Sequence, residues 1–259
     1  MDNISLFDSH AHLDDPKFDA DRDEIITSLK AKNVTNVINI GANIETSIDS
    51  VKLANKYPFI YAAIGVHPYD TNIITTADIE TLKELALNKK VVAIGEIGLD
   101  YHMEELNKEE QKKWFIEQLN LASSLSLPVI IHDRDAHFDT LDIIKKHYSG
   151  KGVFHCFAGS VEMAQELIKM GFYLSFTGVC TFKNAKTVKE VIKIVPLDKF
   201  LIETDCPYLS PEPFRGTRNS PLNVYRIAET IALIKDISYE DVCKYSFDNT
   251  KRLFNIDDI

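Results

Sequence analysis

Histidines and carboxylates stand where apolar, β-branched runs of the sequence end. His10 and His12 lie two residues apart in FDSHAHL, near the N-terminus. Side chains two apart on a strand point to the same side, so one metal ion could take both imidazoles. An H-x-H pair alone is equally well a polar strand exit. Asp8, just before it, supports either the turn or a ligand.

Carboxylates end two further runs. Glu96 follows the apolar stretch of AIGEIGLDYH, and FLIETDCPYL ends with Glu203 and Asp205. An ionised carboxylate within an apolar strand is rare unless it is paired or metal-bound, so Glu96 is either a bridge between two ions or a buried salt-bridge partner. We expect Asp205 to ligate one ion and accept the proton of an attacking water. Glu203, deeper in the run, is expected to orient a ligating histidine.

Two more histidines occupy matching positions. His132 in PVIIHDRDAH and His155 in GVFHCFAGS end successive apolar runs. A lone histidine there is more often a satisfied core residue, but two of them after the earlier candidates favour a second metal position. Asp100 and His102, just beyond Glu96, either orient ligands or are solvated loop residues.

Substrate contacts are expected from one histidine and several arginines. His67 in IGVHPY either contacts a substrate oxygen or caps the loop. Arg134, Arg215 and Arg218 lie on segments that follow the ligand-bearing runs. A guanidinium suits phosphate oxygens, although surface arginines are usually only solvated.

The elements that carry these residues alternate along the chain. Eight apolar runs predict strands at 6–10, 34–40, 60–66, 91–97, 128–132, 152–157, 172–176 and 200–205. Amphipathic stretches such as 21–32, 110–124 and 161–170 predict helices between them. Crossover helices imply a parallel sheet, in which the carboxyl ends of the strands share one face.

This alternation predicts the α/β class and, specifically, a (β/α)8 TIM barrel. An open doubly wound sheet is the alternative. Residues 1–259 show no linker, so we expect a single domain, with additional C-terminal helices at 224–234 and 239–254.

Composition limits the classes of partner. A net charge of −10 opposes the diffuse attraction that long duplexes exploit, so nucleic-acid contact should be local. The four cysteines form no C-x-x-C pair, which argues against a disulfide framework or a thiolate zinc cluster. No apolar run approaches the roughly 20 residues that span a bilayer, and the first ten residues lack a signal-like block. We expect a cytoplasmic protein without a membrane partner.

The ordered motifs resemble those of the TatD family of metal-dependent deoxyribonucleases across nearly the whole chain. They are FDSHAHL, GEIGLDYH, IHDRDAH, HCFAGS, ETDCPYLSP with FRGTRNSP, and NTKRLF. The resemblance implies an amidohydrolase-like TIM barrel with two divalent ions that cleaves DNA phosphodiesters, often from the 3′ end. It also implies that one ion is held by His10, His12 and Asp205 and the other by His132 and His155, with Glu96 bridging them. Asp133 replaces a small residue typical of the family, which would place extra negative charge near the site.

Three functions follow as hypotheses. The favoured one is a deoxyribonuclease that cleaves single-stranded DNA or strand ends by a metal-activated water. An amidohydrolase acting on a small ester, lactone or amide is the first rival, although many such barrels use a carboxylated lysine where this chain has Glu96. A non-catalytic metal-containing binding protein is the second. Four imidazoles favour Zn, Mn, Fe or Co over Mg, whereas family members are commonly described as Mg-dependent, so we expect two divalent ions with Mg, Mn and Zn as alternatives.

Overall fold

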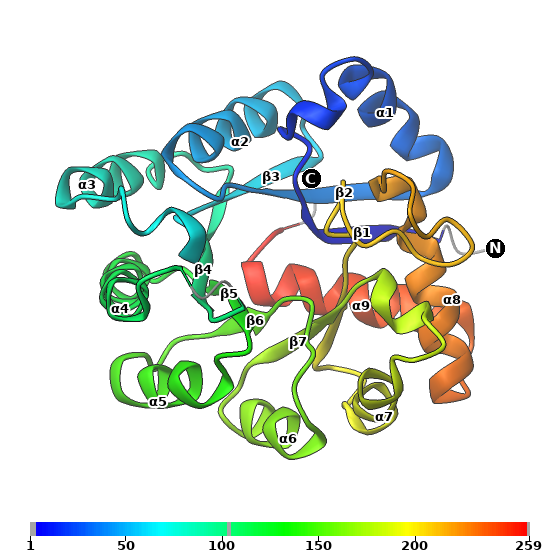
Figure 1. The fold of residues 1–259 in the computed structure, drawn as a ribbon. Coiled ribbons are helices and arrows are strands. Elements are labelled where there is room, and N and C mark those ends of the chain that lie inside the picture. The colour runs from blue at the N-terminus through cyan, green and yellow to red at the C-terminus, as the bar shows by residue number, and fades with distance from the viewer. Residues whose placement is uncertain (1–3, 103–104, 258–259) are drawn as a thin grey trace. The chain divides into compact units, whose positions relative to one another are not determined.

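A parallel sheet carries the chain's fold. The structure is a computed structural model that describes residues 4–102 and 105–257. Within those ranges eight strands form one sheet whose order follows the sequence (Figure 1). The strands are β1 Leu6–Ala11, β2 Val34–Ile40, β3 Ile60–Ile64, β4 Val91–Asp100, β5 Val129–Arg134, β6 Gly152–Phe154, β7 Tyr173–Phe176 and β8 Phe200–Ile202.

The first and last strands adjoin, which decides between the two expected topologies. Ala11 forms a parallel bridge with Cys206, just beyond β8, and the His12 amide donates to the Cys206 carbonyl at 2.8 Å. Sequential order with β1 next to β8 confirms the (β/α)8 barrel. The doubly wound alternative is wrong, because in that topology the strand order reverses.

Helices follow the strands. They are α1 Arg22–Ser28, α2 Ile44–Lys56, α3 Thr76–Leu85, α4 Lys108–Leu125, α5 His137–His147, α6 Val161–Lys169, α7 Lys186–Ile194, α8 Val224–Lys235 and α9 Tyr239–Phe254. Short 3₁₀ turns include η1 Pro16–Phe18, η3 Pro68–Asp70 and η4 Gly178–Thr181. The additional C-terminal helices are confirmed as α8 and α9. None of the helices in the described ranges combines the length and apolarity needed to cross a bilayer.

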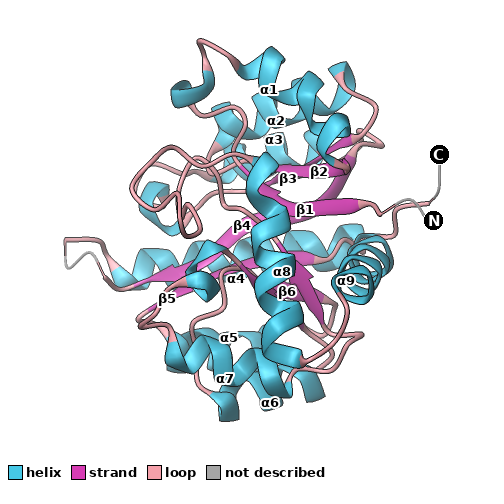
Figure 2. Cartoon of the chain, turned by 90° about the vertical axis from the view of Figure 1, so that its right-hand side faces the viewer, coloured by secondary structure: helices cyan, strands magenta, loops and turns pink. Residues whose placement is uncertain are grey.

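The chain divides into two compact units, and each is described by itself. The first unit comprises Met1–Asn39 with Cys156–Ile259. Here α9 packs on β1, β8 and α8, and Figure 2 shows α9 beside α8 and the end of β1. The buried Asn249 amide on α9 donates to the carbonyls of Leu197 and Phe200 at 2.8 and 2.9 Å, which fixes the start of β8.

The second unit comprises Ile40–His155. All ten residues of β4 are buried, as expected for a parallel strand covered on both faces. Helix α4 packs on β4 and carries two buried glutamines. Gln118 pairs with both backbone groups of Val66, at 2.7 and 3.0 Å, and Gln111 pairs with both backbone groups of Asp100, each at 2.9 Å. These pairs hold the backbone on which His67 and Asp100 stand.

Candidate metal centre

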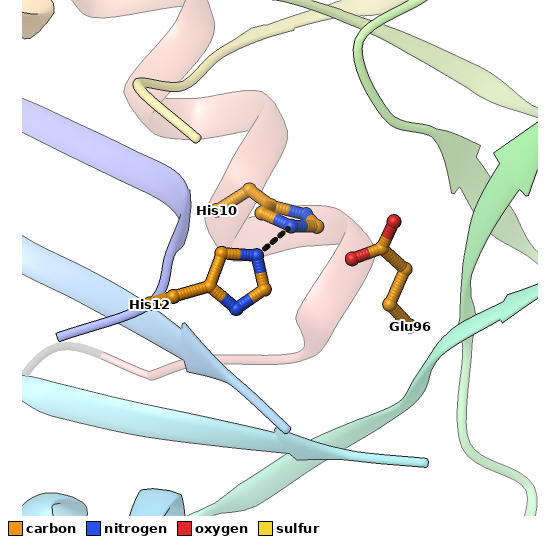
Figure 3. Close-up of side chains that lie close together, drawn as sticks. All are labelled: His10, His12 and Glu96. Carbon is orange, nitrogen blue, oxygen red and sulfur yellow. Dashed lines mark hydrogen bonds between the residues drawn. The ribbon is translucent and has the colours of Figure 1, made fainter. Parts of the chain in front are cut away.

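In the first unit, two imidazoles and a carboxylate converge. The Nε2 atoms of His10 and His12 lie 3.1 Å apart, and Figure 3 shows the two rings turned toward each other. The Asp205 Oδ1 atom lies 3.6 Å from His10 Nε2 and 3.4 Å from His12 Nε2. His10 is fully buried, whereas the side chains of His12 and Asp205 keep 13% and 14% exposure. The structure therefore brings His10, His12 and Asp205 together, as the sequence predicted.

Pairing between the ends of β1 and β8 positions this group. The buried Asp8 carboxylate accepts hydrogen bonds from the Thr204 amide and hydroxyl at 2.9 and 2.5 Å. Burial raises the pKa of Asp8 to about 7, against the opposing effect of the Thr204 bonds. The Asp205 amide donates to the His10 carbonyl at 2.9 Å. Asp8 therefore ties the two strand ends together, which is the supporting role expected for it.

Glu203 lies close to one of the candidate ligands, because one of its carboxylate oxygens is within 4.8 Å of a ring nitrogen of His10, a position compatible with the orienting role predicted for it. Strand β8 ends at Ile202, so Glu203 lies just beyond the strand, and Asp205 has a left-handed φ of 54°. The Glu203 Oε1 atom accepts the Cys156 amide at 2.7 Å. Glu203 is nearly fully buried, and this bond fixes the turn that follows β6.

In the second unit, Glu96 is the centre of a histidine group. Its Oε1 atom lies 2.7 Å from His132 Nδ1 and 2.8 Å from His155 Nε2. The two ring nitrogens are themselves 3.2 Å apart. All three side chains are at most 16% exposed. The structure thus brings together the three ligands predicted from the ends of β5 and β6 and from β4.

Asp100 binds the other nitrogen of the His132 ring. The His132 Nε2 atom lies 2.9 Å from Asp100 Oδ2. Burial disfavours charge on His132, but the hydrogen bonds with Asp100 and Glu96 outweigh it and raise its pKa. A carboxylate on the distal nitrogen fixes the tautomer and ring orientation of a metal-binding histidine. The geometry is the one expected of Asp100 in an orienting role.

His67 also faces Glu96, as a neutral donor. Its Nδ1 atom accepts the Tyr69 amide at 3.2 Å, which assigns the proton to Nε2, and this atom lies 3.6 Å from Glu96 Oε1. Burial lowers the pKa of His67 to about 3, and the neighbouring His132 acts in the same direction. The loop-capping and substrate-contacting interpretations are therefore compatible, because each uses a different ring nitrogen.

The three arginines differ in their surroundings. Arg218 pairs with the Asp21 carboxylate, with Nη1 at 2.8 Å from Oδ1, and the guanidinium lowers the pKa of Asp21. Arg215 is exposed and lies over the Phe182 ring, 4.3 Å from its centroid. Arg134 is exposed, and its guanidinium faces the Tyr69 hydroxyl.

Two acidic residues on the segment after His132 are paired with other histidines. Asp133 accepts hydrogen bonds from His137 at 2.8 Å and Thr140 at 3.2 Å, both on α5. The expected extra charge near the site is therefore wrong, because strand alternation turns Asp133 to the opposite face from His132. His102 pairs with Asp135 at 3.1 Å on the surface, consistent with the solvated alternative for His102.

Sequence reasoning missed Gln111, Gln118 and Thr204, which hold backbone or carboxylate groups beside the candidate ligands. Gln111 and Gln118 lie seven residues apart on α4, on the face that also carries Trp114 and Leu119. Polar residues within an apolar helical stripe are the one signal that could have found them.

Comparison with known proteins supplies the family. The sequence model of the family described as "TatD related DNase" matches residues 7–255 of this chain. The chain belongs to the TatD-related DNase family. The resemblance seen in the motifs is thus confirmed, and membership makes this TatD-family chain a metal-dependent hydrolase.

Relatives and solved structures agree with this assignment. An uncharacterised metal-dependent hydrolase of Bacillus subtilis, YabD, is 47% identical over 97% of this chain and 99% of its own. The 3′-5′ ssDNA/RNA exonuclease TatD of Escherichia fergusonii is 34% identical over 97% and 99%. The crystal structure of YJJV, a TatD homologue from Escherichia coli K12, superposes with a TM-score of 0.92 at 30% identity and covers 97% of this chain and 98% of its own.

The donor atoms of this TatD-family chain fit divalent metal ions. In the second unit, the Glu96 Oε1 atom lies 2.7 and 2.8 Å from ring nitrogens of His132 and His155. In the first unit, two imidazole nitrogens face a carboxylate oxygen. Imidazole and carboxylate donors suit Zn, Mn, Fe or Co, and a set of nitrogen and oxygen donors without thiolates also admits Mg. The residues present therefore fit the metal-dependent chemistry of the family.

Proposed function

We propose that this protein is a nuclease that hydrolyses phosphodiester bonds of single-stranded DNA, removing nucleotides from the 3′ end. The observation that carries the proposal is the pair of histidine–carboxylate groups, each with a carboxylate close to the nitrogens of two imidazoles. The exonuclease named among the relatives supports this substrate class and the polarity. Three of the four cysteines, Cys180, Cys206 and Cys243, are buried, which argues against a covalent thiol mechanism at those positions.

We also propose that both groups act as one two-ion centre within a single domain spanning residues 1–259. His10, His12 and Asp205 would hold one ion, and His132 and His155 the other, with Glu96 shared between them. Carboxyl ends of the strands share one face in a (β/α)8 barrel, which supports this assignment. Mg, Mn and Zn are all admitted, and a cytoplasmic location stays a prediction.

The chain's own residues would perform the following tasks. Bound divalent ions supply an activated water and stabilise charge on phosphate oxygens. Asp205, partly exposed beside its two imidazoles, accepts the proton of the attacking water. His67 donates its Nε2 proton to a phosphate oxygen, because its Nδ1 atom is already occupied by the Tyr69 amide. Arg134, Arg215 and Arg218 contact neighbouring phosphates, although Arg218 must exchange or share its bond with Asp21.

The test is degradation of 5′-labelled single-stranded DNA by the full chain with Mg, Mn or Zn. We expect a ladder of shortened, 5′-labelled products that EDTA abolishes. Asp205→Asn should lower kcat by about 10²- to 10⁴-fold, the usual contribution of a general base. Asp142→Asn, which changes a surface carboxylate paired with Lys146, is the matched control and should retain activity.

Two results would contradict the nuclease proposal, and a third would change the role of Asp205. Absence of any shortening with every metal would remove the nuclease function. Turnover of a small ester or lactone in its place would favour the amidohydrolase alternative. Full activity of Asp205→Asn would leave the nuclease function standing but remove Asp205 from it.

A further inference from the structure

An exposed tyrosine stands beside the candidate ligands of the first unit. The Tyr208 side chain is 46% exposed, and its ring centroid lies 6.4 Å from that of His12, in an edge-on arrangement. A large aromatic ring left in solvent at the edge of a metal-binding group has no role in packing a core. Its position suits contact with a substrate that reaches His12.

Two hydrogen bonds hold this ring in place. The Tyr208 amide donates to the Asp205 carbonyl at 3.0 Å, and the phenol hydroxyl donates to the Asp15 carboxylate at 2.9 Å. The Tyr208 backbone is thus anchored to a candidate ligand, Asp205, and the phenol hydroxyl is anchored to the loop after β1. A rigid aromatic surface loses little conformational entropy when a planar group stacks on it.

A flexible cation now covers one face of the ring. The Lys17 ammonium lies 4.3 Å from the Tyr208 centroid, and Lys17 is exposed. A cation–π contact at an exposed site is worth only about 0.5–1 kcal/mol, so an incoming base can displace it. The released ammonium would then be available to a phosphate of the same strand.

Further rings and cations follow on the same segment of chain. Phe214 is 39% exposed, and the exposed Arg215 lies over Phe182. Aromatic rings interleaved with cations are the usual means of binding single strands without sequence preference. Acidic residues such as Asp15 lie among them, so the rings rather than a strongly positive field would recognise the strand.

We propose that Tyr208 is a stacking platform for a nucleobase of the substrate strand, with Lys17 moving from the ring face to a backbone phosphate. The inference deepens the proposed nuclease function and rests on it. It assigns recognition of unpaired bases to this ring, because a base within a duplex has both faces already stacked and cannot lie on Tyr208.

The test compares two strands of equal length with the full-length protein. One is a natural single-stranded oligonucleotide, and the other carries abasic residues near its 3′ end. Base–aromatic stacking of about 1–3 kcal/mol corresponds to roughly 5- to 150-fold in affinity. We therefore expect the wild type to show a KM at least about five-fold lower for the natural strand than for the abasic strand, and Tyr208→Leu to bring this KM ratio near one.

Three variants serve as controls. Tyr208→Phe keeps the ring and should keep the preference for bases. Tyr245→Leu removes a ring on α9 that also has a lysine nearby, Lys244, and should leave the preference unchanged. Lys17→Gln should keep the preference and lower the salt dependence of binding by about one phosphate contact.

Binding measured by fluorescence anisotropy in EDTA separates the two proposals. If Tyr208→Leu loses the preference for the natural over the abasic strand in this binding assay, stacking is supported. This holds even if no strand is degraded and the nuclease proposal fails. A wild-type protein that treats natural and abasic strands alike, or a Tyr208→Leu variant that keeps the full preference, overturns the inference while leaving a nuclease function intact.

Discussion

Two neighbouring residues on β5, His132 and Asp133, face opposite sides of the strand. The partner of Asp133 makes the free energy of unfolding depend on pH. His132 faces Glu96, whereas Asp133 faces His137 on α5. The hydrogen bond with Asp133 raises the pKa of His137, against partial burial. A histidine whose pKa is raised on folding binds its proton more tightly in the native state, so the pair stabilises the fold only while His137 is protonated.

We expect the contribution of His137 to be complete below its unfolded pKa of about 6.5 and to be lost as pH rises through the higher folded value. The His137 side chain is 42% exposed, so solvent screening keeps the effect below about 1 kcal/mol. Urea unfolding of wild type and His137→Gln, both in EDTA, should differ more at pH 5.5 than at pH 9. A difference that is constant across this range would contradict the assignment.

At the scale of elements, α4 fixes strand ends through side chains rather than through apolar packing alone. Gln118 satisfies both the amide and the carbonyl of Val66, immediately before His67. Because Gln118 is only 1% exposed, no water can replace it at these backbone groups without rearrangement.

Gln118→Met should therefore lower the free energy of unfolding by about 1–3 kcal/mol, the cost of leaving buried backbone groups without partners. Chemical denaturation of the metal-free protein measures the change. The exposed neighbour Glu117→Gln is the matched control and should stay within about 0.5 kcal/mol of wild type. An unchanged midpoint for Gln118→Met would show that the two hydrogen bonds contribute nothing net.

Most elements could be predicted because apolar periodicity is local information. The boundaries of β2 and α9 match the prediction, since Val34–Ile40 is rich in β-branched residues and Tyr239–Phe254 is amphipathic. β6 and β8 end earlier than predicted. Cys156 and Asp205 have left-handed φ values of 43° and 54°. A left-handed conformation at a cysteine or an aspartate does not change the hydropathy pattern, so the pattern could not predict where these strands end.

The candidate ligands could be predicted for a related reason. Chain topology brings strand ends together, so residue type at a strand end is enough to find His132 or Asp205. The partners of those residues could not be found in this way. Thr204 and Asp8 are hydrogen-bonded but lie 196 positions apart in the sequence. Gln111 bonds the backbone of Asp100, and because backbone groups are alike along the chain, the sequence does not indicate which of them a buried glutamine will bind.

At the scale of the whole molecule, each unit supplies its own set of candidate ligands, and this predicts how metal content responds to substitution. His12→Asn removes a donor from the first unit, and His132→Asn removes one from the second. If each group holds its own ion, each variant should retain about half of the wild-type metal content, and the double variant almost none.

Elemental analysis of protein passed through a desalting column, with unfolding curves to confirm that each variant is folded, gives these ratios. Complete loss of metal in either single variant would mean that one group cannot bind alone. Wild-type content in either would remove that residue from the ligands.

The division of the chain also sets an order for synthesis on the ribosome. Residues 40–155 form one continuous unit, whereas the other unit is split into an early and a late portion. The middle portion can acquire its contacts while translation proceeds. His10 and His12 are synthesised near the start of the chain and Asp205 near its end. The contacts between the two imidazoles and the Asp205 carboxylate can therefore form only late in elongation.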